Sequence, residues 1–103
     1  MQNHKQLSIN DFIKICNRIA QEKGWWDIER SDGELIALMH SELSEALEAM
    51  RNSRPIEEIA EELADCCIRI FDYCGQKNID LEDALIKKIE KNKTRPYRHN
   101  KKF

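Results

Sequence analysis

The sequence predicts an all-α fold, a compact bundle of four helices that is completed by oligomerisation. Apolar residues recur at three- and four-residue intervals in four successive segments, which is the spacing of one helix face. No segment alternates apolar and polar residues as a strand does, and no repeat or low-complexity linker interrupts the chain. A chain of 103 residues with 41% hydrophobic content is expected to form one domain, residues 1–103, with a modest core. Short helices on such a chain commonly complete their core by association.

The first predicted helix begins at Ser8, which forms a capping box with Asp11, and its apolar run ends at Gly24. Trp25 and Trp26 follow in a polar connection. Packing is the more common role of either tryptophan, and stacking on a nucleobase is the alternative for one of them. The inner face of this helix is expected to contain Ile9, Phe12, Ile13, Cys16, Ile19 and Ala20.

The second predicted helix begins at Ser31, with Glu34 as its capping-box partner, and ends at about residue 50. After a short turn, Pro55 favours the first turn of a third helix. The third helix is expected to continue to a stop at Gly75.

The fourth predicted helix begins after Asp80, which acts as its cap. It is expected to end at Arg95-Pro96, because the residue before a proline is driven out of the α region. Residues from about 94 to 103 are expected to form a basic tail that is extended or mobile. The inner face of the helix is expected to contain Ala84, Leu85 and Ile89.

The net charge of −2 conceals an uneven distribution. Residues 87–103 hold eight lysines and arginines and one acid, so the other 86 residues carry a balance of −9. An acidic body with a basic tail suits an anionic ligand held between them, or a contact with nucleic acid. No apolar run is long enough to span a bilayer, and the N-terminus lacks the order of a signal peptide. The four cysteines form no CxxC pair, which favours buried, reduced thiols and a cytoplasmic location.

Two pairs of acids are the main chemical feature of the chain. Glu42 and Glu45 stand three residues apart on the second predicted helix, and Glu62 and Asp65 do the same on the third. A three-residue step places both members on one face, and each pair lies beside the apolar stripe of its helix. If the helices pack on those stripes, four carboxylates meet at one edge of the core, where unpaired charge is unfavourable. We therefore expect a cation there, Mg²⁺ with Mn²⁺ as a substitute, because these ions prefer carboxylate and phosphate oxygens.

Two alternatives compete with a magnesium site. A single pair of this kind is more often a solvated pair of helix acids that forms ion pairs with arginines, here Arg51, Arg54 or Arg69. Two pairs on consecutive helices favour the metal site instead. A di-iron bundle needs Glu-x-x-His motifs, and the nearest histidine, His40, precedes Glu42 by two residues and lies on a different face.

Lys88, Asn92 and Arg95 share one face of the fourth predicted helix, at spacings of four and three residues. An ammonium group, an amide and a guanidinium form a plausible phosphate clamp. A basic helix end alone is more often a favourable interaction with the helix dipole. The clamp is meaningful here because a metal-and-phosphate site needs both an acidic and a basic half.

These motifs together resemble the MazG-like all-α nucleoside triphosphate pyrophosphohydrolases. Glu42-x-x-Glu45, sixteen further residues and Glu62-x-x-Asp65 are similar to the ExxE…ExxD signature of that family. The segment Lys88-x3-Asn92-x2-Arg95-Pro96-Tyr97 resembles its third motif, and the similarity extends from about residue 24 to the C-terminus. A further glutamate that many members carry directly before the first ExxE is replaced by Ser41.

The resemblance implies a Mg²⁺-dependent hydrolase in which water attacks the α-phosphorus, releasing a nucleoside monophosphate and pyrophosphate. It further implies a homodimer or homotetramer that removes unwanted nucleotides, a house-cleaning role. The implied catalytic metal ligands are Glu42, Glu45, Glu62 and Asp65. The implied substrate contacts are Lys88, Asn92 and Arg95 for the phosphates and Trp25 or Trp26 for the base.

Two other functions compete with this one. A non-enzymatic helical dimerisation module would contact nucleic acid through the basic tail, but the −9 body would repel a phosphate backbone. Nucleic acid is therefore not the expected partner. A metal-dependent pyrophosphatase for a non-nucleotide substrate would use the same metal and phosphate residues, so only its substrates would distinguish it.

Overall fold

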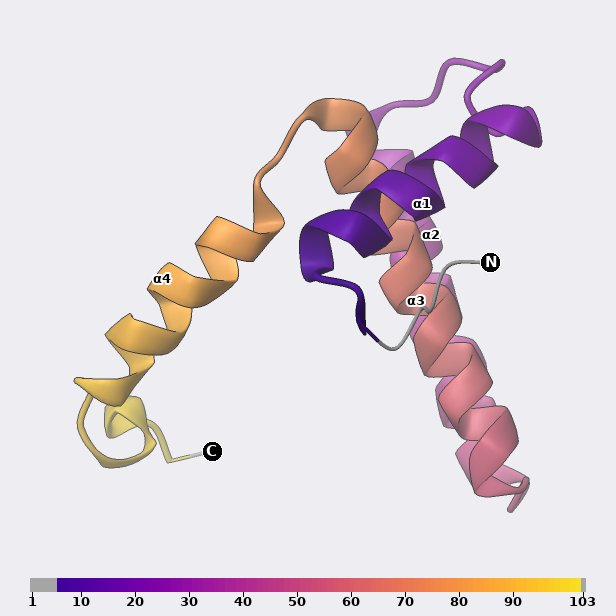
Figure 1. Ribbon diagram of the computed structural model, residues 1–103. Helices are drawn as coiled ribbons and strands as arrows, with labels where there is room; N and C mark the ends of the chain where they lie inside the picture. The colour runs from indigo at the N-terminus through magenta and orange to yellow at the C-terminus, as the bar shows by residue number, and fades with distance from the viewer. Residues whose placement is uncertain (1–5, 103) are drawn as a thin grey trace.

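The computed structural model describes residues 6–102, which form helices and connections and contain no strand (Figure 1). The predicted all-α fold is confirmed. The elements are α1 (Ile9–Glu22), α2 (Asp32–Arg51), α3 (Ile56–Lys77), α4 (Leu81–Lys93) and a short 3₁₀ turn, η2 (Tyr97–Asn100). None of the helices in this described part has the length and apolar character needed to cross a membrane.

The predicted helix starts are found where side-chain caps were expected. Ser8 and Asp11 form both bonds of a capping box at the start of α1. The Ser31 side chain accepts a hydrogen bond from the backbone N–H of Glu34 at the start of α2. The Asp80 carboxylate caps α4 in the same way. These bonds satisfy N–H groups that a helix leaves unpaired in its first turn.

The predicted stop at Gly75 is wrong. Helix α3 continues to Lys77 and ends at Asn78, which adopts the left-handed conformation with φ of 57°. Gly75 lies inside the helix, where α3 meets α1. A Cβ atom there would lie 2.7 Å from Cβ of Asn17, so the missing side chain permits close approach of the two helices.

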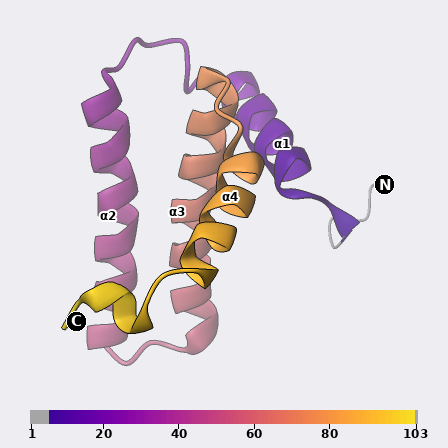
Figure 2. The same ribbon diagram turned by 90° about the vertical axis from the view of Figure 1, so that its left-hand side faces the viewer.

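Helix α3 is the centre of the fold. It runs antiparallel to α2, and α1 crosses its other side (Figures 1 and 2). The apolar side chains that this arrangement buries are small or of medium size, as expected where helices approach closely. They are Ile13, Cys16, Ala20, Ala46, Cys66 and Cys74. Burial raises the pKa of all three of these thiols, which agrees with the prediction of buried, reduced cysteines; Cys67 alone is exposed.

Helix α4 departs from this three-helix core. Its first turn is attached to α1, where the backbone and side-chain nitrogens of Asn10 donate to Glu82 at 3.2 and 3.1 Å. The rest of α4 leads away from α2 and α3 (Figure 1). The radius of gyration is accordingly 16.1 Å, against about 13 Å for a compact chain of this length.

The expected burial of the inner face of α4 is not seen in the single chain. Ala84 is exposed, and Leu85, Ile86 and Ile89 are 40%, 57% and 54% exposed. The C-terminal segment is also not fully extended, because η2 forms a short turn at Tyr97–Asn100. Arg98 and His99 adopt the left-handed conformation there.

Candidate active site

The pairing of α2 with α3 brings acidic side chains together at the edge of the core. Glu42, Glu62 and Asp65 each offer an oxygen, and these oxygens all lie within 4.8 Å of one another. Glu42 is only 8% exposed. Glu45 lies one turn after Glu42, and its carboxyl is near enough to that of Glu62 to raise the pKa of Glu62. We refer to these four residues as the acidic cluster; the two predicted pairs do meet.

Glu62 shows how strongly this cluster disfavours a full set of charges. Sharing of a proton with the Glu45 carboxyl, partial burial, and repulsion from Glu45, Asp65 and Glu42 raise the pKa of Glu62 from 4.5 to about 6. Its Oε2 atom is shielded from water and has no hydrogen-bond partner among the described residues. A buried carboxyl oxygen in that position requires a proton or a cation. The acidic cluster therefore fits a divalent cation with oxygen ligands.

An arginine provides part of the neutralising charge. The Nε atom of Arg69 donates to Oε1 of Glu42 at 2.9 Å. Arg54 pairs instead with Glu58 on the surface. The alternative of acids paired with arginines therefore holds for Glu42, whereas Glu62 and Asp65 form no ion pair with any described lysine or arginine.

A cavity of about 320 Å³ adjoins the acidic cluster, and we call it the α1–α3 cavity. It shares Glu42 and Asp65 with the cluster, so a ligand in the cavity would reach any cation held there. Its volume lies in the range of small-molecule sites, which are mostly apolar with a few fixed polar groups. Its polar lining is Glu42, Asp65, Arg69 and Asp72, and its apolar lining is Cys16, Ile19, Ala20, Trp25 and Ile68.

The two adjacent tryptophans have different environments. Trp25 is 51% exposed and lines the α1–α3 cavity. The guanidinium carbons of Arg30 and Arg69 lie 5.8 and 5.9 Å from the centre of its ring, within the range of cation–π attraction. Trp26 is half-buried and donates its indole N–H to Oδ1 of Asp72 at 2.9 Å. Trp26 is thus an anchor between the connection and α3.

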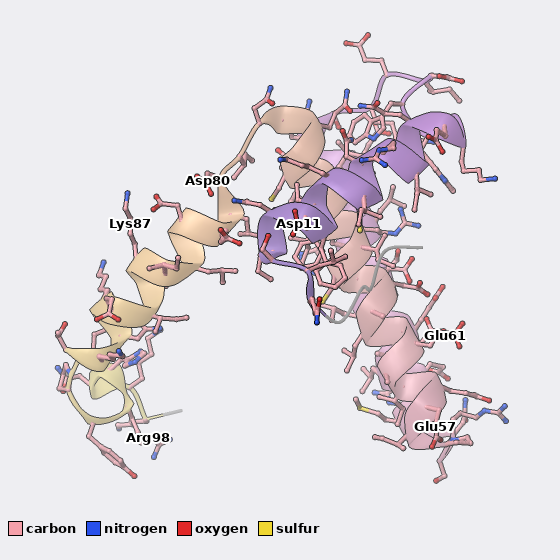
Figure 3. All side chains as sticks on the ribbon, in the orientation of Figure 1. Asp11, Glu57, Glu61, Asp80, Lys87 and Arg98 are labelled. Carbon is pink, nitrogen blue, oxygen red and sulfur yellow. The ribbon has the colours of Figure 1, made fainter. Side chains whose placement is uncertain are left out.

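The single chain does not bring the predicted phosphate clamp to the acidic cluster. Lys88, Asn92 and Arg95 lie on and just after α4, which leads away from α2 and α3. Lys88 and Asn92 are exposed, and Arg95 is half-exposed. Figure 3 shows their neighbour Lys87 on the side of the molecule opposite Glu57 and Glu61 of α3.

Asp72 was not predicted to be a site residue, and Arg69 was predicted only as a possible ion-pair partner for helix acids. A signal for both was present in the spacing. Asp65, Arg69 and Asp72 stand four and three residues apart, so they continue the face of α3 that carries Glu62. The cavity itself had no such signal, because α1 contributes Cys16, Ile19 and Ala20 from a distant part of the chain.

Carboxylates from two antiparallel helices beside a cavity that contains an arginine form the kind of all-α site that holds a cation against an anionic ligand. Comparison with protein families identifies the family to which this domain belongs. The model of the MazG nucleotide pyrophosphohydrolase domain matches residues 30–99, a range that contains the whole acidic cluster and α4. The chain belongs to this family, and nucleotide pyrophosphohydrolysis is the general activity that this membership supports. Searches of curated proteins and of solved structures found no match.

Proposed function

We propose that this protein hydrolyses ribo- or deoxyribonucleoside triphosphates to the monophosphate and pyrophosphate, in a reaction that depends on Mg²⁺, with Mn²⁺ as a substitute. The observation that carries the proposal is the group of carboxyl oxygens within 4.8 Å of one another, adjoining a cavity of about 320 Å³. The cluster suits a metal that contacts phosphates, and the cavity has room for a nucleoside.

The acidic cluster would hold the cation through Glu42, Glu45, Glu62 and Asp65. When bound, Mg²⁺ supplies positive charge that stabilises the phosphate oxygens in the transition state. One carboxylate of the cluster accepts a proton from the attacking water. A new oxygen–phosphorus bond then forms at the α-phosphorus, the bond to the bridging oxygen breaks, and pyrophosphate leaves. The exposed face of Trp25 is the proposed stacking surface for the base, and Trp26 anchors the same connection to α3 through its hydrogen bond to Asp72.

We further propose that Lys88, Asn92 and Arg95 contact the phosphates across a homodimer or homotetramer. Two observations support this assembly. The apolar face of α4 is exposed in the single chain, and α4 leads away from its own acidic cluster. Packing that face on a second copy would bury it and bring basic residues toward the partner's acids. The proposed role is house-cleaning of cytoplasmic nucleotide pools.

A nucleotide panel tests this function. Standard and modified ribo- and deoxyribonucleoside triphosphates are incubated with and without Mg²⁺, and the products are separated by chromatography. Metal-dependent formation of monophosphate and pyrophosphate is expected. Diphosphate with orthophosphate would mean cleavage of a different bond. No turnover of any nucleotide would favour a non-nucleotide substrate or a binding module.

A further inference from the structure

The polar residues of α3 that line the α1–α3 cavity alternate between acceptor and donor along the helix. Asp65, Arg69 and Asp72 all line the α1–α3 cavity, and they follow one another at successive turns of the helix. Seven residues separate Asp65 from Asp72, a rise of about 10 Å. The cavity therefore presents a member of the acidic cluster, then a hydrogen-bond donor, then an acceptor at the greatest distance from the cluster.

The acceptor is held in place by a network between α1 and α3. Oδ1 of Asp72 accepts hydrogen bonds from Trp26 Nε1 and Asn17 Nδ2, both at 2.9 Å. Asn17 is itself fixed by Gln21 and Gln76, at 2.9 and 3.0 Å. Oδ2 of Asp72 takes part in no hydrogen bond with a described residue. The network therefore fixes the Asp72 side chain through Oδ1 and leaves Oδ2 available to accept a hydrogen bond from a ligand.

The donor is Arg69. Its Nε atom is engaged by Glu42, and its terminal nitrogens donate to no described residue. The guanidinium lies over the ring of Trp25, 5.9 Å from the ring centre. A base that stacks on Trp25 would bring its polar edge within reach of these N–H groups. A guanidinium can only donate, and the carboxylate of Asp72 can only accept.

We infer that the α1–α3 cavity selects nucleotides whose base carries an exocyclic amino group on the edge far from the sugar, as cytosine and adenine do. This inference rests on the proposed function, which places the phosphates at the acidic cluster. The substituent at position 4 of a pyrimidine lies opposite the nitrogen that bears the sugar, and position 6 of a purine is similarly remote. That substituent therefore meets Asp72, and the neighbouring ring nitrogen meets Arg69.

The two base classes differ at both contacts. An amino group donates to Asp72 while the adjacent unprotonated ring nitrogen accepts from Arg69. An oxo base such as uracil or hypoxanthine reverses this pattern, because its oxygen faces the carboxylate and its ring N–H faces the guanidinium. A site built to bond one pattern rejects the other strongly, since its polar groups lose their partners. The expected preference in kcat/KM is at least about tenfold.

Matched substrate pairs test the inference. The wild-type protein is given dCTP against dUTP, and dATP against dITP, with Mg²⁺; in each pair an amino group is exchanged for an oxygen and the neighbouring ring nitrogen gains a proton. Higher kcat/KM for dCTP and dATP is expected. Hydrolysis of all four at similar rates, or preference for the oxo bases, would overturn the inference and leave the proposed function standing. If nothing is hydrolysed, the proposed function fails, and binding of dCMP against dUMP, followed by tryptophan fluorescence, still decides the selectivity of the cavity.

The substitution Asp72→Asn assigns the selectivity to one residue. The amide oxygen still accepts from Trp26, so the fold is expected to persist, while the amide nitrogen offers a donor to the base. The ratio of kcat/KM for dCTP to that for dUTP should fall about tenfold toward unity. Glu57→Gln, the same chemical change at an exposed position near the start of α3 (Figure 3), should leave the ratio unchanged. An unchanged ratio in Asp72→Asn would exclude Asp72 as the selecting group.

Discussion

Glu62 holds the most unfavourable position of any described side chain in the acidic cluster. It has one carboxyl oxygen shielded from water without a partner, and three other carboxylates are near enough to raise its pKa to about 6. In the metal-free protein the fold thus favours the protonated form of Glu62. The unfolded chain, with an ordinary pKa of 4.5, has no such preference.

This difference predicts how stability depends on pH without metal. Because the folded pKa of Glu62 lies above the unfolded value, its contribution is fully present below about pH 4.5 and is lost as the pH rises through about 6. Urea unfolding in EDTA between pH 4.5 and 7 should show this loss. Glu62→Gln, which cannot ionise, should have a shallower dependence, and an identical pH dependence in both proteins would contradict the assignment. Mg²⁺ at pH 7 should raise the wild-type unfolding midpoint.

Asp65 tests the metal site at the level of activity. Asp65→Asn removes a charged ligand but keeps the shape of the side chain, so turnover should fall at least about a hundredfold while the helices stay folded. Steady-state hydrolysis together with circular dichroism measures both. Glu61→Gln, an exposed position on the same helix (Figure 3), is the matched control and should keep full activity. Full activity in Asp65→Asn would remove Asp65 from the site.

For single residues, the sequence predicts the members of the acidic cluster better than it predicts the lining of the α1–α3 cavity. The spacing of Glu42, Glu45, Glu62 and Asp65 depends only on helical geometry and on which faces pack, so local pattern was sufficient. Asp72 is held in place by hydrogen bonds from Trp26 and Asn17, which lie 46 and 55 residues away in the chain. A contact across that separation leaves no local signal.

Among the elements, helix starts were predictable because their caps are local, whereas the end of α3 was not. Gly75 has the sequence character of a helix stop, yet it serves the contact between α3 and α1. Whether a glycine ends a helix or admits a neighbour depends on which helix packs against it. That information lies in α1, not in the sequence around Gly75.

Gly75→Ala measures this contact. The added Cβ would lie 2.7 Å from Cβ of Asn17 and 3.2 Å from Cγ2 of Ile13, and such overpacking costs about 1–3 kcal/mol. The gain in helix propensity is at most about 1 kcal/mol, so net destabilisation by thermal or urea unfolding is expected.

Gly33→Ala is the matched control, because the nearest atom to its added Cβ is Oγ of Ser31 at 3.9 Å. With propensity alone acting, this variant should be as stable as the wild type or more so. Equal stability of the two variants would show that α1 and α3 accommodate a methyl group at Gly75 without cost.

For the whole molecule, the position of α4 is the main departure from a closed bundle. The apolar face of α4 was predicted from the periodicity of the sequence. Periodicity shows that such a face needs a packing partner, but it does not show which element or subunit provides that partner. Figure 3 shows the acids Glu57 and Glu61 toward one end of the molecule and Lys87 and Arg98 toward another. This separation of charge gives two copies a complementary way to meet.

We expect the protein to be a dimer or tetramer in solution. Ile86→Glu or Ile89→Glu would place a charge on the apolar face of α4 and should shift the mass, measured by light scattering after size exclusion, toward that of a monomer. Ile28, which is 64% exposed in the connection between α1 and α2, provides the control as Ile28→Glu. A monomeric wild-type protein would contradict the proposed assembly.

The ion pair between Arg69 and Glu42 affects how a metal ion would bind to the acidic cluster. The guanidinium of Arg69 already neutralises Glu42. A cation that binds at the acidic cluster must therefore compete with Arg69 for this carboxylate. Under the proposed function, this competition would weaken the binding of loosely held ions, and the Arg69–Glu42 ion pair joins α2 to α3 when no metal is bound. A displaced guanidinium would be available to an anionic ligand, so the binding of metal and the binding of nucleotide would be linked.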